Sequence, residues 1–188
     1  GMIQTILHCL KATVAQVHGY CYGGGLFLAL ACDLTIAAEG TLFTHPGWRY
    51  IGPHGDLALF IEAMGLKRAK ELILTGRPFT TEDALQAGLI NKVVPKDKLD
   101  EEVDRVADTI AKMPLDGIVM GKAQFEACLD ARGIGTGASI AVLGHSLETN
   151  IRYEEGEFNL LRERRERGVR AAIHERMQHF KEDKEGVG

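Results

Sequence analysis

Three consecutive glycines, Gly23, Gly24 and Gly25, separate an extended apolar segment from the apolar run Leu26–Ala31. The pattern predicts a strand that enters a helix through a tight turn. Such a turn leaves several backbone N–H groups without intrahelical partners, at a helix end that carries positive partial charge. Glycine has no Cβ, so a ligand can approach the backbone closely. Two kinds of site use this arrangement: one binds phosphate, and the other stabilises an oxyanion.

The residues after the turn discriminate between these two kinds of site. A phosphate-binding loop would continue with Gly-Lys-Ser/Thr, whereas Leu26-Phe27-Leu28 follows here, and the dinucleotide pattern GxGxxG is absent. An apolar helix start favours a carbonyl oxygen in a dry pocket over a fully charged phosphate. Tight packing of a strand against a helix, with no ligand, remains the alternative interpretation of the three glycines.

The rest of the pattern predicts an α/β fold class with a helical second half. Short β-branched or apolar runs predict strands at residues 12–17, 33–38, 42–45 and 89–94. Helical spacing predicts helices at residues 2–10, 26–31, 56–64 and 66–74. Thr80 and Asp83 resemble a capping box that opens a short helix ending at Gly88. After Pro95 the pattern is helical, at residues 97–113, 115–131, 135–153 and 157–180, with a break at Gly168.

Composition narrows the class of protein. The 188 residues are 45% hydrophobic and 26% charged, the balance of an ordinary globular domain. The net charge of -4 disfavours a nucleic-acid partner, and the apolar stretches are too short to span a membrane. The four cysteines are scattered and no signal peptide is evident, which favours reduced thiols and a cytoplasmic location. No HExxH motif or His/Cys cluster has metal-ligand spacing, so we expect no metal site.

Three ordered segments resemble the crotonase superfamily, which includes the enoyl-CoA hydratase/isomerase family. They are Lys11–Pro46, with its Gly-Gly-Gly and Cys-Asp, Thr75–Pro95, and Gly168–Asp183, which ends in Arg-x-x-x-Phe-Lys. The resemblance implies a crotonase-like (ClpP/crotonase) spiral of ββα units. It further implies a partial core over residues 1–96 and a helical oligomerisation region over residues 97–188, which forms a homotrimer or a dimer of trimers.

The resemblance also implies an acyl-CoA thioester as partner, with coenzyme A as part of the substrate and no other cofactor. In this family two backbone N–H groups polarise the thioester carbonyl. One corresponds to Gly24, and the other belongs to an earlier Ala-Gly-x-Asp loop, which would lie upstream of Gly1 with the early strands of the fold.

Two positions depart from the hydratase pattern. The two catalytic glutamates of hydratases correspond here to Phe27 and Gly47. Adding water to an enoyl-CoA needs a carboxylate pair that holds the water and moves protons. We therefore expect isomerisation, C–C bond cleavage or thioester hydrolysis rather than plain hydration. A noncatalytic CoA-binding or assembly subunit, or a truncated remnant of an active enzyme, is the alternative.

Polar residues after the third strand are candidates for a substitute acid or base. Asp56 is the first candidate and His45 or His54 the next, although Asp56 also suits a helix N-cap and His45 a backbone-bonded strand residue. Arg49 is expected to be a surface or subunit-contact residue. Tyr22 either lines the acyl pocket or packs in the core. The expected substrate-binding residues are Tyr22, Gly23, Gly25, Phe27, Gly47, Trp48, Phe180 and Lys181, the last two contacting CoA unless they form a solvated helix end.

Overall fold

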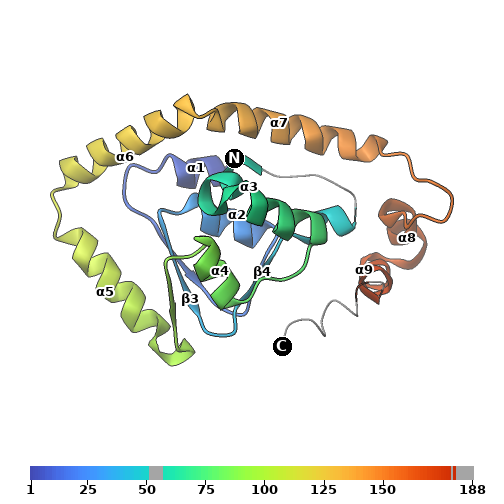
Figure 1. Cartoon of the computed structure of the whole chain (residues 1–188), viewed down its shortest axis with the longest axis horizontal. Helices are drawn as coiled ribbons and strands as arrows, with labels where there is room; N and C mark the ends of the chain where they lie inside the picture. Colours follow the sequence, from blue (N-terminus) through green and yellow to red (C-terminus); the bar gives the residue numbers. More distant parts are fainter. Residues whose placement is uncertain (51–56, 179, 181–188) are drawn as a thin grey trace.

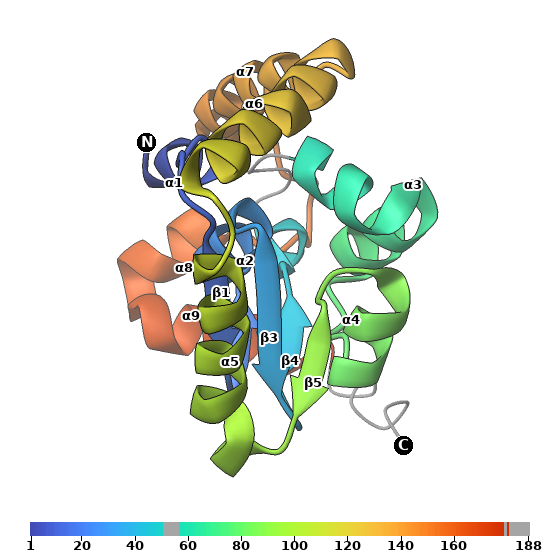
Figure 2. The same ribbon diagram turned by 90° about the vertical axis from the view of Figure 1, so that its left-hand side faces the viewer.

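A parallel three-stranded sheet forms the centre of the molecule. The computed structural model describes residues 1–50, 57–178 and 180. The strand order is β1 (Val14–Val17), β3 (Leu34–Ala38) and β5 (Lys92–Val94). Val14 pairs with Leu34, and Ile36 pairs with Lys92. Helices on the faces of this sheet connect its strands, as an α/β class requires (Figures 1 and 2).

A second, two-stranded parallel sheet carries the glycine turn. Its strands are β2 (Tyr20–Tyr22) and β4 (Leu42–Thr44), with Cys21 opposite Phe43. The sequence pattern did not predict β2, which lies between the first predicted strand and the three glycines. The turn therefore follows β2, and α2 (Gly24–Ala31) begins directly after it.

The helix after β4 is bent into two halves. Helix α3 (Leu57–Thr75) follows the short 3-10 helix η1 (Pro46–Arg49) and is interrupted at Gly65, where φ is 73° and ψ is 161°. The two predicted helices at 56–64 and 66–74 correspond to these halves. Helix α4 (Thr81–Ala87) has the predicted capping box between Thr80 and Asp83, and it ends at left-handed Gly88.

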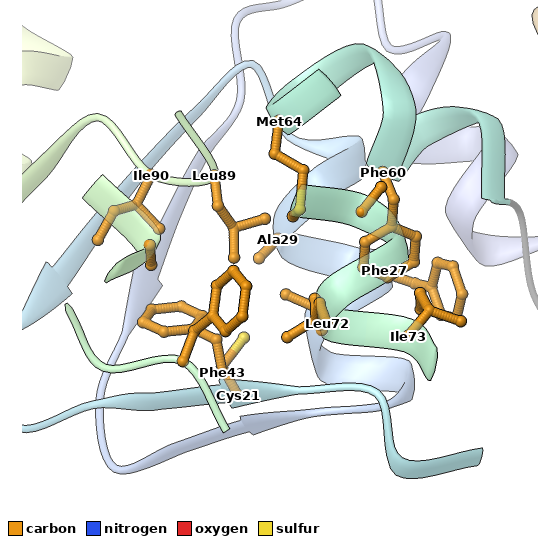
Figure 3. Packing of buried hydrophobic residues seen from close by; sticks show 14 of the residues in the cluster. Cys21, Phe27, Ala29, Phe43, Phe60, Met64, Leu72, Ile73, Leu89 and Ile90 are labelled. Atoms are coloured by element: carbon orange, nitrogen blue, oxygen red, sulfur yellow. The ribbon is translucent and has the colours of Figure 1, made fainter. Parts of the chain in front are cut away.

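One hydrophobic core joins both sheets to these helices. Phe43, Phe60 and Leu72 are completely buried in it, and Phe27 and Cys21 are nearly so. Figure 3 shows side chains from α2, α3 and β4 meeting in this cluster. Burying side chains of this size contributes roughly 1.5–3 kcal/mol each.

The second half of the chain is helical, as predicted. Helices α6 (Leu115–Ala131) and α7 (Ile134–Leu147) form a long arc across one side of the core (Figure 1). Helices α8 (Leu160–Arg167) and α9 (Val169–Gln178) lie at the end of the molecule near η1. Among the described residues, no helix is long and apolar enough to cross a membrane. The remaining elements are α1 (Met2–Leu7), η2 (Lys96–Lys98), α5 (Leu99–Ala111) and η3 (Glu148–Asn150).

Candidate active site

The glycine turn presents backbone N–H groups at the start of α2. Gly23 donates its N–H to the carbonyl of Thr44 (3.0 Å) and accepts the first helical hydrogen bond from the N–H of Phe27 (3.1 Å). The N–H groups of Gly24, Gly25 and Leu26 precede that bond, so the helix itself supplies no acceptor for them. Gly23 has φ of +51°, a conformation that residues with a Cβ rarely adopt. The turn thus leaves these backbone N–H donors at the start of α2 in a fixed conformation.

The surface around these donors is open. Gly24 and Gly25 are both exposed, and a Cβ built on either glycine meets no atom within 4 Å. A hollow of about 390 Å³ lies beside Gly25 and is lined by Cys21, Leu28 and other residues of β1, β2 and α2. Burial raises the pKa of the Cys21 thiol to about 11, so this thiol stays protonated at neutral pH. The start of α2 thus presents the N–H groups of Gly24 and Gly25 beside a hollow with largely apolar walls.

One turn into α2, Phe27 belongs to a cluster of three rings. The ring centroids of Phe27 and His45 are 5.0 Å apart, and those of Phe27 and Phe60 are 5.2 Å apart, both in edge-to-face geometry. His45 also meets Phe60 at 6.0 Å. All three side chains are buried, and Figure 3 shows Phe27 and Phe60 in contact. The region around Phe27 is therefore dry and aromatic.

Arg49 corrects one expectation. It is buried, with 5% exposure, so the expected surface position is wrong, while the alternative of a subunit contact stays a prediction. Its Nε donates to the carbonyl of Thr75 (2.7 Å), and its guanidinium lies 4.0 Å from the ring centroid of Phe180. Gly76 makes room for it, because a Cβ there would lie 2.7 Å from Arg49 Nε. The arginine is held by the end of α3 and the C-terminal segment.

A groove of about 470 Å³ lies between the small sheet and α9. Tyr22, Tyr50, Arg49 and Phe180 are among its lining residues. Burial raises the pKa of Tyr22, and Tyr20 and Tyr50 raise it further. Arg176 on α9 donates from Nε to the carbonyl of Arg49 (2.5 Å) and lies 5.0 Å from the Phe180 ring. Burial and the neighbouring Arg49 lower the pKa of Arg176.

Besides the glycines of the turn, the predicted site residues lie at two further places. Phe27 and His45 meet in the ring cluster, and Tyr22 and Phe180 line the groove. Gly47 is buried in η1, followed by half-buried Trp48. His54, Asp56 and Lys181 lie outside the described residues, so their predicted roles stay predictions. Sequence reasoning missed Phe60, whose place in the cluster depends on the packing of α3 against α2.

The chain matches known proteins over most of its length. A profile described as "Enoyl-CoA hydratase/isomerase" matches residues 2–166. The chain belongs to this family. A probable mitochondrial enoyl-CoA hydratase of Dictyostelium discoideum is 39% identical over 114 residues, which are 60% of this chain and 41% of the relative. A probable enoyl-CoA hydratase of Rhizobium meliloti (strain 1021) is 30% identical over 185 residues, 96% of this chain and 66% of the relative.

Solved structures of the enoyl-CoA hydratase/isomerase family share the fold. An enoyl-CoA hydratase from Mycobacterium smegmatis superposes with a TM-score of 0.83 at 28% identity, over 95% of this chain and 60% of that one. An enoyl-CoA hydratase/isomerase from Xanthobacter autotrophicus Py2 has a TM-score of 0.81 at 30% identity, over 94% and 65%. The expected crotonase fold is confirmed, and the chain spans about two-thirds or less of each of these four proteins.

Proposed function

We propose that the chain binds an acyl-CoA thioester and stabilises negative charge on the thioester oxygen through the N–H of Gly24. One observation carries this proposal. The N–H groups of Gly24 and Gly25 lie at the exposed start of α2, before the first intrahelical hydrogen bond, which Gly23 accepts from Phe27. Donors fixed in advance at the point where charge develops are among the largest contributions to catalysis. Family membership supports the thioester as ligand.

The proposed chemistry develops negative charge on the thioester oxygen, as an enolate in isomerisation or C–C bond cleavage and as a tetrahedral intermediate in thioester hydrolysis. Phe27 and Gly47 stand where hydratases are expected to carry carboxylates, and neither can hold water or move a proton. Isomerisation, C–C bond cleavage and thioester hydrolysis each need an oxyanion donor, but they do not need the carboxylate pair of the hydratases. His45, whose ring lies 5.0 Å from that of Phe27, is one candidate for proton transfer. Asp56 and His54 are the other two.

The substitution Gly24→Pro tests the oxyanion role. Proline is well suited to the first position of a helix, so it removes the N–H while α2 can still form. Losing one such donor costs about 10²–10³ in turnover. Gly24→Ala separates the two properties of this residue, because it keeps the N–H, its Cβ meets no protein atom within 4 Å, and any loss of turnover then reports the close approach of the ligand to the backbone. Turnover is measured with crotonyl-CoA and a panel of acyl-CoA thioesters, and equal turnover by folded Gly24→Pro contradicts the proposal.

A noncatalytic CoA-binding or assembly subunit is the second candidate. The dry contact of Phe27, His45 and Phe60 favours it, because three buried rings leave little space for an activated water. This candidate predicts micromolar affinity for CoA thioesters together with no turnover of any of them. Isothermal titration and the turnover panel on one preparation distinguish the two functions.

We also propose that the chain assembles as a homotrimer or a dimer of trimers. Apolar side chains on α6 and α7 support assembly, since Phe125 is 74% exposed and Val142 is 70% exposed. Exposed apolar surface of this kind is typical of interaction sites. Sedimentation velocity measures the mass, and a monomer at all concentrations contradicts this assembly.

A further inference from the structure

Thr44, the last residue of β4, joins the glycine turn to the end of α3. The carbonyl of Thr44 accepts a hydrogen bond from the N–H of Gly23 (3.0 Å), and its hydroxyl donates to the carbonyl of Gly76 (2.9 Å). Thr44 is 2% exposed and Gly76 is also buried, so solvent does not replace the bond between them. A buried carbonyl that loses its donor is costly, which makes this contact a strong constraint on the end of β4.

The conformation of Gly23 decides where the N–H of Gly24 points. The carbonyl of Gly23 and the N–H of Gly24 belong to one planar trans peptide unit, so they point in opposite directions. That carbonyl accepts from the N–H of Phe27 (3.1 Å), while the N–H of Gly23 donates to Thr44. Gly23 has φ of 51° and ψ of -114°, which is a region that glycine alone adopts readily. Two hydrogen bonds, one at each end of Gly23, therefore fix the direction of the Gly24 N–H.

The acceptor of the Thr44 hydroxyl is itself held in place. Gly76 donates its N–H to the carbonyl of Leu72 (3.0 Å) in the last turn of α3. Its φ is +59°, and a Cβ at this position would lie 2.7 Å from Nε of Arg49. The same Nε donates to the carbonyl of Thr75 (2.7 Å). Helix α3 and Arg49 thus fix the backbone to which Thr44 is attached.

We infer that Thr44 is a positioning residue for the reaction: its hydroxyl holds the end of β4 against Gly76, and its carbonyl holds Gly23 so that the N–H of Gly24 meets the charge on the thioester oxygen. The inference rests on the proposed function, because it needs that oxygen at Gly24. Thr44 acts through Gly23 and does not contact the reacting atoms.

Thr44→Val tests the inference, because it removes the hydroxyl and nearly keeps the shape of the side chain. The variant is expected to fold, since the preceding residue, Phe43, still pairs with Phe79 through two backbone hydrogen bonds (2.7 and 2.9 Å). The substrate is the acyl-CoA thioester that the wild-type chain turns over fastest. We expect kcat to fall by about 10–100-fold, as for a donor displaced by up to about 1 Å. We expect kcat/KM to fall equally, because the interaction is made in the transition state.

Thr41→Val is the matched control at the other end of β4. Thr41 is completely buried, and its hydroxyl donates to the carbonyl of Ala38 (2.6 Å). The two variants lose hydrogen bonds of the same kind, but only Thr44→Val is expected to lose turnover. Thr44→Ser keeps a hydroxyl donor and is expected to restore most of the turnover. Thr44→Cys has a weak donor and is expected to lie between Thr44→Ser and Thr44→Val.

The double variant Gly24→Pro/Thr44→Val tests whether Thr44 acts through Gly24. Once the Gly24 N–H is absent, its position no longer matters, so the double variant is expected to be about as slow as Gly24→Pro alone. If the two losses of kcat multiply instead, Thr44 acts on turnover independently of Gly24, and the inference is overturned.

Amide hydrogen exchange measures the attachment of the turn without a thioester. The N–H of Gly23 is expected to exchange faster in Thr44→Val than in the wild-type chain, relative to the N–H of buried Leu89, which donates to Ala84 (2.9 Å). The reference amide removes the effect of a general loss of stability. Thr41→Val is expected to leave the ratio of the two rates unchanged.

The outcomes separate this inference from the proposed function. Wild-type turnover by folded Thr44→Val, or an unchanged exchange ratio for Gly23, overturns the inference and leaves the proposed function standing. An equal loss of turnover in Thr41→Val has the same meaning. If Thr44→Val does not fold, equal turnover by Thr44→Ser and Thr44→Cys overturns the inference. If the wild-type chain turns over no thioester, the proposed catalysis fails, and the inference fails with it.

Discussion

The α/β core and the α6–α7 arm, residues 115–147, hold their apolar side chains in opposite ways. In the core, Phe43, Phe60 and Leu72 are completely buried. Of the described residues of the arm, only Ile134 is buried, although Phe125 and Val142 are as apolar as the core residues and are mostly exposed. Burial of apolar side chains stabilises the core, whereas the arm leaves most of its apolar side chains exposed.

Two ion pairs attach the arm to the core. Lys122 of α6 binds both carboxylate oxygens of Asp33, at 2.6 and 2.7 Å. Arg132, after α6, pairs with Glu62 of α3 at 2.9 Å. Exposed ion pairs contribute little, but one that is partly buried and shares hydrogen bonds contributes more. The difference between the two regions is therefore a difference in the kind of interaction, and substitutions can test it.

The largest expected effect is in the core. Phe43→Ala removes a fully buried ring that lies beside Cys21 and Leu72 in Figure 3. We expect a loss of about 3–5 kcal/mol in the free energy of unfolding, from lost burial and the cavity left behind. Urea unfolding followed by circular dichroism measures it. A loss below about 1 kcal/mol would show that the core does not depend on this cluster.

The second prediction concerns the junction between the two regions. Lys122→Met removes the ammonium group from Asp33, which still accepts hydrogen bonds from the N–H (2.7 Å) and hydroxyl (2.8 Å) of Thr13. The Lys122 side chain is only 11% exposed, so solvent replaces its contacts poorly. We expect a loss of about 2 kcal/mol, the range for hydrogen bonds to charged groups.

Arg105→Met is the matched control for that junction. Arg105 pairs with Glu102 inside α5, and its side chain is 62% exposed. We expect a change of about 0.5 kcal/mol or less, as for other exposed pairs on one helix. Equal losses in the two variants would mean that the contact with Asp33 does not attach α6 to the core.

Local signals were read correctly from the sequence. Thr80 and Asp83 form the predicted capping box, and Gly65 separates two helical halves as the pattern indicated. Each depends on residues within one or two turns of each other, where backbone chemistry decides the outcome. The resemblance added the overall fold, because three ordered segments identify an arrangement that no single one specifies.

Features that depend on distant residues were missed. Strand β2 has three residues, and Tyr20 is 75% exposed, so only pairing with β4 defines it. Arg49 is buried between the end of α3 and Phe180, which lies near the far end of the chain. The contact of Phe60 with His45 and Phe27 likewise joins three separate elements. The pattern of residues along the sequence does not indicate contacts between such distant elements.

The smallest expected effect is in the arm. Phe125→Ser replaces a side chain that is 74% exposed on α6, although Phe125 is as large as Phe43. In dilute solution, where assembly is absent, we expect the free energy of unfolding to change by about 0.5 kcal/mol or less, as for most surface substitutions. Urea unfolding at several protein concentrations measures this value and separates it from assembly, because stabilisation by association depends on concentration.

An effect of Phe125→Ser that grows with concentration would place this side chain in an interface and would sharpen the contrast between the two regions. A loss above about 2 kcal/mol that is independent of concentration would break the contrast, because it would mean that the arm packs within its own chain as the core does. Together with Phe43→Ala, this substitution removes the same aromatic ring from two environments, so a difference of several kcal/mol between the two losses reports mainly how each ring is packed.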